Sequence, residues 1–101
     1  MKHISPSELK QKLDVGADLF LLDVREDFEH EDFNIGGVLI PLGEIFASVD
    51  EIPKDKPVIA YCRKGIRSQI AIQKLEEKYG FTNLINLEGG MEKWKKLATS
   101  Q

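Results

Sequence analysis

Cysteine is the scarcest informative residue in this chain. Its 101 residues include a single cysteine, Cys62. One cysteine cannot form an internal disulfide, which excludes the small secreted domains that depend on disulfides for stability. A thiol that must stay free suits a reducing compartment, so we expect a cytoplasmic protein.

Long apolar runs and a one-sided charge are also missing. The first ten residues, MKHISPSELK, lack the apolar core of a signal peptide. No stretch approaches the roughly 20 apolar residues of a membrane-spanning helix. The 14 basic and 17 acidic side chains are interleaved and give a net charge of −3. A nucleic-acid surface needs a basic face, so we do not expect a nucleic acid as partner. The missing apolar runs likewise argue against a membrane as partner.

Histidine is nearly as scarce as cysteine. His3 and His30 lie far apart in the sequence, and neither has the spacing from Cys62 that is typical of zinc ligands. We interpret both as surface histidines. The sequence therefore predicts no metal site, and nothing in it indicates an organic cofactor.

What the chain does contain is an alternation of short apolar runs and helical patterns. A length of 101 residues favours one domain spanning 1–101. Ser5, Pro6 and Glu8 form the start signal of a first helix. Strands are expected at 19–24, 37–41, 58–61 and 83–87, and helical segments at 28–33, 42–52, 67–79 and 89–97. Strands separated by helices indicate a mostly parallel sheet and an α/β fold.

The segment YCRKGIRS places Cys62 directly after the apolar strand VIAY and before a helix. Ligands of parallel sheets bind at this end of the strands. The amides at a helix start, a glycine turn and the basic residues Arg63, Lys64 and Arg67 all favour an anion there. We therefore predict that Cys62 is largely thiolate at neutral pH. A buried, inert core cysteine is the alternative, and the Arg-Lys-Gly that follows disfavours it.

The order of motifs around this cysteine resembles the single-domain rhodanese family of sulfurtransferases. The loop CRKGIR (62–67) is similar to the family's active-site loop. LLDVRE (21–26), NIGGVLIPL (34–42) and LEGGMEKW (87–94) resemble three further elements of its pattern. The resemblance covers nearly the whole chain. It implies a rhodanese-like fold, with a mostly parallel central sheet of about five strands and helices on both faces.

The sequence departs from the family pattern at the edge of the implied site. Phe33-Asn34 stand in place of the usual Gly-His, Leu39 in place of an Asn, and Gly37 in place of an Ala. The family uses this region to shape the site's edge. We therefore expect the departures to affect substrate preference more than the fold.

The resemblance also implies a reaction. Cys62 would take the outer sulfur of a small anionic donor such as thiosulfate, or of a persulfide donor, and become a persulfide. A thiol acceptor, for example a thiol of a small protein, or cyanide would then remove that sulfur. No cofactor takes part, and a covalent intermediate implies ping-pong kinetics.

The other loop residues have separable expected roles. Gly65 is expected to allow a positive φ or a close approach of backbone to sulfur. Arg67 either braces the loop or contacts the donor. Arg63 and Lys64 either attract an anionic donor or are solvated surface charges. Ile66 is expected to anchor the loop against the domain.

Four residues outside the loop are interpreted as structural support. Asp23 and Arg25 follow the end of a strand, where they are expected to hold neighbouring loops through hydrogen bonds and charge. Gly89 and Gly90 are expected to make a tight turn beside the site.

Two other functions are compatible with parts of the sequence. A cysteine phosphatase or arsenate reductase also places a cysteine and an arginine around an anion loop. The phosphatases that share the rhodanese fold have five residues between the two, whereas this chain has four, Arg63 to Ile66. A sulfur-carrier or protein-interaction module without enzymatic activity is the second alternative. The sequence does not separate a carrier from an enzyme.

Overall fold

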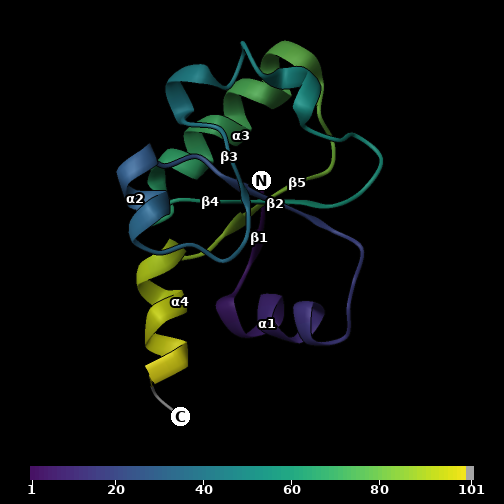
Figure 1. Ribbon diagram of the computed structural model, residues 1–101. Helices are drawn as coiled ribbons and strands as arrows, with labels where there is room; N and C mark the ends of the chain where they lie inside the picture. Colours follow the sequence, from purple (N-terminus) through teal and green to yellow (C-terminus); the bar gives the residue numbers. More distant parts are fainter. Residues whose placement is uncertain (100–101) are drawn as a thin grey trace.

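The computed structural model describes residues 1–99, so the last two residues of the expected domain lie outside it. A five-stranded sheet with the strand order β1-β5-β4-β2-β3 forms the centre (Figure 1). All neighbouring strands run parallel. This confirms the expected α/β class and the sheet of about five strands. The strands are β1 Lys2–Ile4, β2 Phe20–Asp23, β3 Val38–Leu39, β4 Val58–Tyr61 and β5 Leu84–Leu87.

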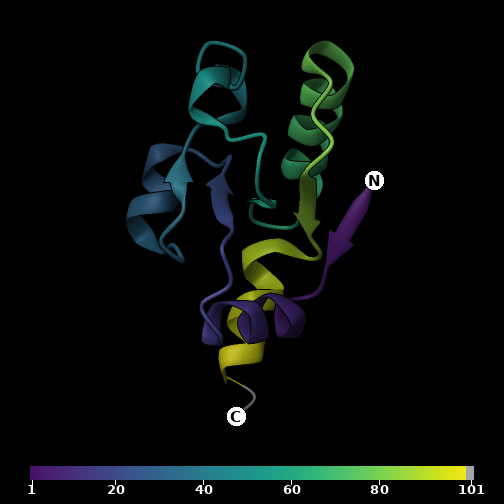
Figure 2. The same cartoon turned by 90° about the vertical axis from the view of Figure 1, so that its right-hand side faces the viewer.

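Helices cover both faces of the sheet, as Figure 2 shows from the side. One face carries α3 (Ile66–Tyr79) and the 3₁₀ helices η1 (Leu42–Glu44) and η2 (Val49–Glu51). The other carries α1 (Pro6–Asp14) and α4 (Gly90–Thr99), and the short α2 (Asp27–Asp32) follows β2. Each face has its own cluster of buried apolar side chains. Among residues 1–99, none of the helices has the length and apolar character that crossing a membrane requires.

Two elements differ from the sequence-based expectation. β1 was not expected from the residues, because three residues are too short for a periodic pattern. Its place is set by parallel pairing with β5, His3 opposite Asn86. Residues 42–52 form two 3₁₀ helices, not one helix. Gly43 and Ser48 are weak helix formers, and the apolar residues at helical spacing still pack on the α3 face.

β4 is the central strand of the sheet, and it leads directly into the candidate site. All four of its residues are buried, as a strand covered on both faces requires. Its neighbour β2 runs parallel to it, with Asp23 opposite Tyr61. The carboxyl ends of the two strands therefore place Cys62 and the residues after Asp23 at the same edge of the sheet.

Candidate active site

Cys62 is both packed in the core and open to a small cavity. Its side chain is 1% exposed and belongs to the apolar cluster beneath α3. The Gly65 amide donates a hydrogen bond to its Sγ at 3.1 Å, and the Ser68 Oγ lies 3.5 Å away. A cavity of about 220 Å³ is lined by Cys62 and by Arg63, Lys64, Ile66 and Arg67. The cysteine is therefore as buried as the core alternative supposed, but a polar loop surrounds it.

Gly65 turns the chain from the loop into α3. Its φ is +95°, which confirms the expected positive φ, and it stands at the N-cap of the helix. An L side chain rarely adopts this conformation. The turn aims the Gly65 amide at the sulfur and places the start of α3, beginning at Ile66, beside it. Positive partial charge at a helix start favours an anion at this position.

The loop is held by the first turn of α4. The amide of Met91 donates to the Cys62 carbonyl at 2.9 Å, and the amide of Glu92 donates to the Arg63 carbonyl at 3.0 Å. The glycine pair before them forms the expected turn, with φ of +72° at Gly89 and +56° at Gly90. A Cβ at Gly90 would overlap the Cys62 carbonyl oxygen.

Ile66 does not anchor the loop, so that expectation is wrong. Its side chain is 63% exposed and lines the cavity instead. The backbone bonds from α4 do the anchoring. A further bond, from the Gln69 side chain to the Gly65 carbonyl at 2.9 Å, ties the loop to α3.

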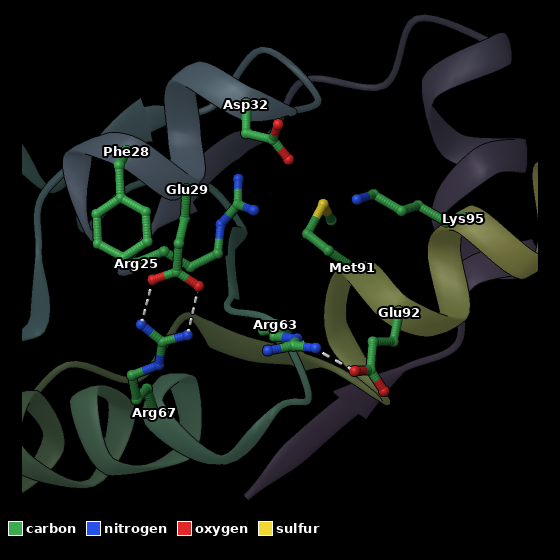
Figure 3. A pocket seen from close by; sticks show the side chains of 9 residues that line it. All are labelled: Arg25, Phe28, Glu29, Asp32, Arg63, Arg67, Met91, Glu92 and Lys95. Carbon is green, nitrogen blue, oxygen red and sulfur yellow. Dashed lines mark hydrogen bonds and ion pairs between the residues drawn. The ribbon is translucent and has the colours of Figure 1, made fainter.

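Arg67 is fully engaged by a carboxylate across the site. Its Nη1 and Nη2 donate to Oε1 and Oε2 of Glu29 on α2, at 2.7 and 2.8 Å (Figure 3). The bond with Arg67 lowers the pKa of Glu29 from 4.5 to about 2. The same bond raises the pKa of Arg67, and so does interaction with Cys62. Of the two roles left open for Arg67, the geometry supports bracing.

Asp23 and Arg25 form a buried ion pair at the end of β2. Arg25 donates from Nε and Nη2 to the two carboxylate oxygens, at 2.9 and 2.7 Å. Its Nη2 also donates to the Phe33 carbonyl at 2.6 Å, and His30 Nδ1 lies 2.9 Å from Asp23 Oδ2. Burial by itself raises the pKa of Asp23, but the hydrogen bonds from Arg25 and His30 hold it below its ordinary value. His30 is thus half-buried, which corrects its interpretation as a surface residue.

A larger cavity of about 660 Å³ adjoins the loop (Figure 3). It shares Arg63 and Arg67 with the smaller one. Arg63 faces Glu92, with Nε 3.2 Å from Oε2. The remaining lining residues are Arg25, Phe28, Glu29, Asp32, Met91 and Lys95. Within residues 1–99, no group of three or more His, Cys, Asp or Glu side chains is arranged to hold a metal ion.

One departure from the family pattern has a direct cause in the structure. A Cβ at Gly37 would lie 2.6 Å from the hydroxyl of Tyr61 and 2.9 Å from its ring. Tyr61 is fully buried in β4, immediately before Cys62. A side chain at position 37 would therefore force the buried Tyr61 ring to move.

Several site residues escaped the sequence analysis. Glu29 lies in a short acidic helix without a distinctive pattern, and its partner Arg67 is distant in sequence. Asn86 did carry a signal, because it is the one polar residue among the apolar residues of LINL, 84–87. Its Oδ1 accepts a bond from the Ser68 hydroxyl at 2.5 Å, behind Cys62.

Known proteins of one family are similar to this chain over most of its length. The family model "Rhodanese-like domain" matches residues 5–97. The "Putative sulfurtransferase YtwF" of Bacillus subtilis (strain 168) is 38% identical over 96 residues, which cover 94% of this chain and 91% of that protein. "Thiosulfate sulfurtransferase GlpE" of Coxiella burnetii is 33% identical over 96 residues, covering 94% of this chain and 85% of that one.

A solved structure shows the same fold. The crystal structure of a rhodanese-like domain protein from Staphylococcus aureus superimposes with a TM-score of 0.85 at 33% identity. It covers 93% of this chain and 91% of that one. This confirms the rhodanese-like fold expected from the sequence motifs. The match of the family model to nearly the whole chain shows that this protein belongs to the rhodanese-like domain family.

Proposed function

We propose that the protein is a sulfurtransferase that carries a sulfane sulfur as a persulfide on Cys62. The observation that carries the proposal is the environment of Sγ. The sulfur lies at the start of α3, accepts a bond from the Gly65 amide and faces a small cavity. These groups stabilise negative charge on sulfur before and after transfer without rearranging.

The reaction has two steps. The Cys62 thiolate attacks the outer sulfur of thiosulfate, the sulfur–sulfur bond of the donor breaks, and sulfite leaves with the electron pair. The terminal sulfur of the new persulfide carries the negative charge. An acceptor thiolate or cyanide then attacks that sulfur, and the Cys62 thiolate leaves. Both steps balance without a cofactor.

The residues of the loop and its supports have different proposed roles, which follow from their positions. Arg63 and Lys64 are exposed at the cavity, where they attract an anionic donor. Arg67 is held by Glu29 and fixes α2 against the start of α3. Asp23 and Arg25 support the neighbouring turn, and Gly89 and Gly90 bring α4 against the loop. The placement of the protein in the cytoplasm remains a prediction from its single cysteine.

The geometry supports sulfur transfer over phosphate hydrolysis. Four residues separate Cys62 and Arg67, and the guanidinium of Arg67 is already bonded to both oxygens of Glu29. In a phosphatase this arginine has to be available for the phosphate oxygens. A cavity of about 220 Å³ beside the sulfur accommodates a small donor.

One observation favours a protein thiol as the acceptor. Phe28 is 71% exposed and Ile66 is 63% exposed, and both line the cavities at the site. Exposed apolar side chains around a reactive centre fit a macromolecular partner better than a small anion. This version, a carrier that passes sulfur to one protein, uses the same Cys62 persulfide.

The test is the intact mass of the reduced protein before and after incubation with thiosulfate. We expect the wild type to gain one sulfur atom and Cys62→Ser to gain none. Cyanide should remove the added sulfur and release an equal amount of thiocyanate. If the wild type gains no sulfur while its thiol alkylates quickly, thiosulfate is the wrong donor. If the thiol is also unreactive, the sulfurtransferase proposal is wrong.

A further inference from the structure

A line of polar side chains leads from Cys62 to the edge of the sheet. Ser68 Oγ on α3 lies 3.5 Å from the sulfur and donates to Asn86 Oδ1 on β5 at 2.5 Å. Asn86 Nδ2 lies 3.3 Å from Nδ1 of His3 on β1. Cys62, Ser68 and Asn86 are buried, whereas His3 is exposed. The line therefore connects the buried sulfur to a solvent-accessible titratable group.

The hydrogens along this line have a direction. A serine hydroxyl has one proton to donate, and Ser68 gives it to Asn86. The Ser68 oxygen therefore presents a lone pair to the sulfur and accepts from a Cys62 thiol. At the outer end, the Asn86 amide donates to His3 Nδ1. Every donor points outward, which is the arrangement that suits a protonated sulfur.

A sulfur anion needs the opposite direction. A thiolate accepts hydrogen bonds only, so the Ser68 proton has to turn toward it. Asn86 Oδ1 then loses its donor unless the amide turns over, which leaves its shape nearly unchanged. In the turned form Asn86 Nδ2 donates to Ser68, and Oδ1 accepts from a proton on His3 Nδ1. Each buried polar group again has a partner, as burial demands.

We propose that His3, Asn86 and Ser68 form a reversible hydrogen-bond chain whose direction follows the charge on Cys62. The three are positioning residues, and a proton on His3 Nδ1 favours the inward direction and the thiolate. No proton crosses the amide: the Cys62 proton leaves to solvent, and His3 takes its proton from solvent. A role of this hydrogen-bond chain in catalysis rests on the proposed sulfur transfer. The existence of the hydrogen-bond chain does not depend on that function.

Other charged side chains lie near the hydrogen-bond chain, and their effects on Cys62 have to be distinguished from its effect. Lys2 precedes His3 on β1, and Glu88 follows Asn86 by two residues. Arg67 and Arg63 adjoin Ser68 and Cys62, and each is paired with a glutamate. Lys2 is exposed and shares the short strand of His3. Its substitution is therefore the matched control for a change of charge at this edge.

The experiment measures alkylation of Cys62 by iodoacetamide, a neutral reagent, between about pH 5 and pH 9. It needs no sulfur donor, so it remains informative even if sulfur transfer fails. We expect Ser68→Ala to slow alkylation about tenfold at neutral pH, because the thiolate loses a hydroxyl donor. We expect His3→Ala to slow it about fivefold at the acidic end of this range and to leave it unchanged at the alkaline end. Lys2→Ala should match the wild type at every pH.

The double variant decides whether the chain carries the effect. With Ser68 replaced by Ala, adding His3→Ala should change nothing further, because the connection is already broken. An equal effect of His3→Ala with and without Ser68 would mean that charge acts through space and would overturn the chain. A His3→Ala profile identical to the wild type would overturn it as well. Circular dichroism of each variant confirms that the fold is intact.

Discussion

Gly89→Ala and Gly90→Ala give the sharpest test of how the loop is held. Both glycines have a positive φ, so alanine costs about 1–2 kcal/mol of backbone strain at either position. What the new Cβ meets differs. At Gly89 it meets the side chain of Lys93, whose Cγ and Cδ can rotate away, so that only the Lys93 Cβ, 2.9 Å away, requires a small shift within α4. At Gly90 it overlaps the Cys62 carbonyl oxygen and lies 2.7 Å from that of Arg63, so the loop that begins at Cys62 has to move.

The expected results follow from that contrast. A contact with backbone oxygen becomes ordinary at 3.4 Å, so Gly90→Ala displaces the loop by up to about 1 Å. A displacement of that size costs about a hundredfold in rate, whereas Gly89→Ala should stay within about threefold of the wild type. The assay is kcat/KM for transfer from thiosulfate to cyanide, with urea unfolding alongside. Equal activity losses in the two variants would refute the view that α4 positions the Cys62 backbone.

Three further predictions concern the frame of the site. Gly37→Ala should lower the free energy of unfolding by about 1–3 kcal/mol through overpacking. Adding Tyr61→Phe should recover part of that loss by removing the hydroxyl. If the effects of the two substitutions in urea unfolding are strictly additive, this contact is excluded. Glu29→Gln should lower the Tm at neutral pH. Because the folded pKa of Glu29 is depressed to about 2, its stabilisation is present above about pH 4.5, declines below it and is lost as pH falls through 2. Melting curves of Glu29→Gln and the wild type should therefore converge in acid, and Glu31→Gln, an exposed acid on the same helix, should show little effect throughout. Asp23→Asn leaves its buried arginine partner uncompensated and should cost about 3 kcal/mol in urea unfolding; a loss of rate with unchanged stability would assign Asp23 to the chemistry instead.

The parts of the fold that depend on local sequence could be predicted from it. The strand 58–61 and the C-terminal boundary of the helix after it were confirmed, because an apolar run and a C-terminal glycine mark them. The positive φ of Gly65 was also predictable, since the strand has to turn into a helix within the four residues 62–65. The class of fold followed from the alternation of elements.

Contacts between distant segments could not be predicted. Nothing in the short acidic helix indicates that Glu29 pairs with Arg67, because the pairing depends on how α2 lies against α3. The three residues of β1 become a strand only through β5. Residues 42–52 have the apolar spacing of a helix with one buried face. Two 3₁₀ helices place the same apolar residues against α3 equally well. Ile66 is an apolar residue whose exposure at the cavity no local pattern foretells.

The loop around Cys62 owes its shape to backbone groups on both sides. Its Gly65 amide points inward to the sulfur, while the carbonyls of Cys62 and Arg63 point outward and accept from the first turn of α4. Loop carbonyls that are shielded from water need hydrogen-bond partners of their own. The helix start supplied by Gly89 and Gly90 meets that need with its unpaired amides. The glycine pair near the end of the chain is therefore part of the sulfur site, although it does not touch the sulfur.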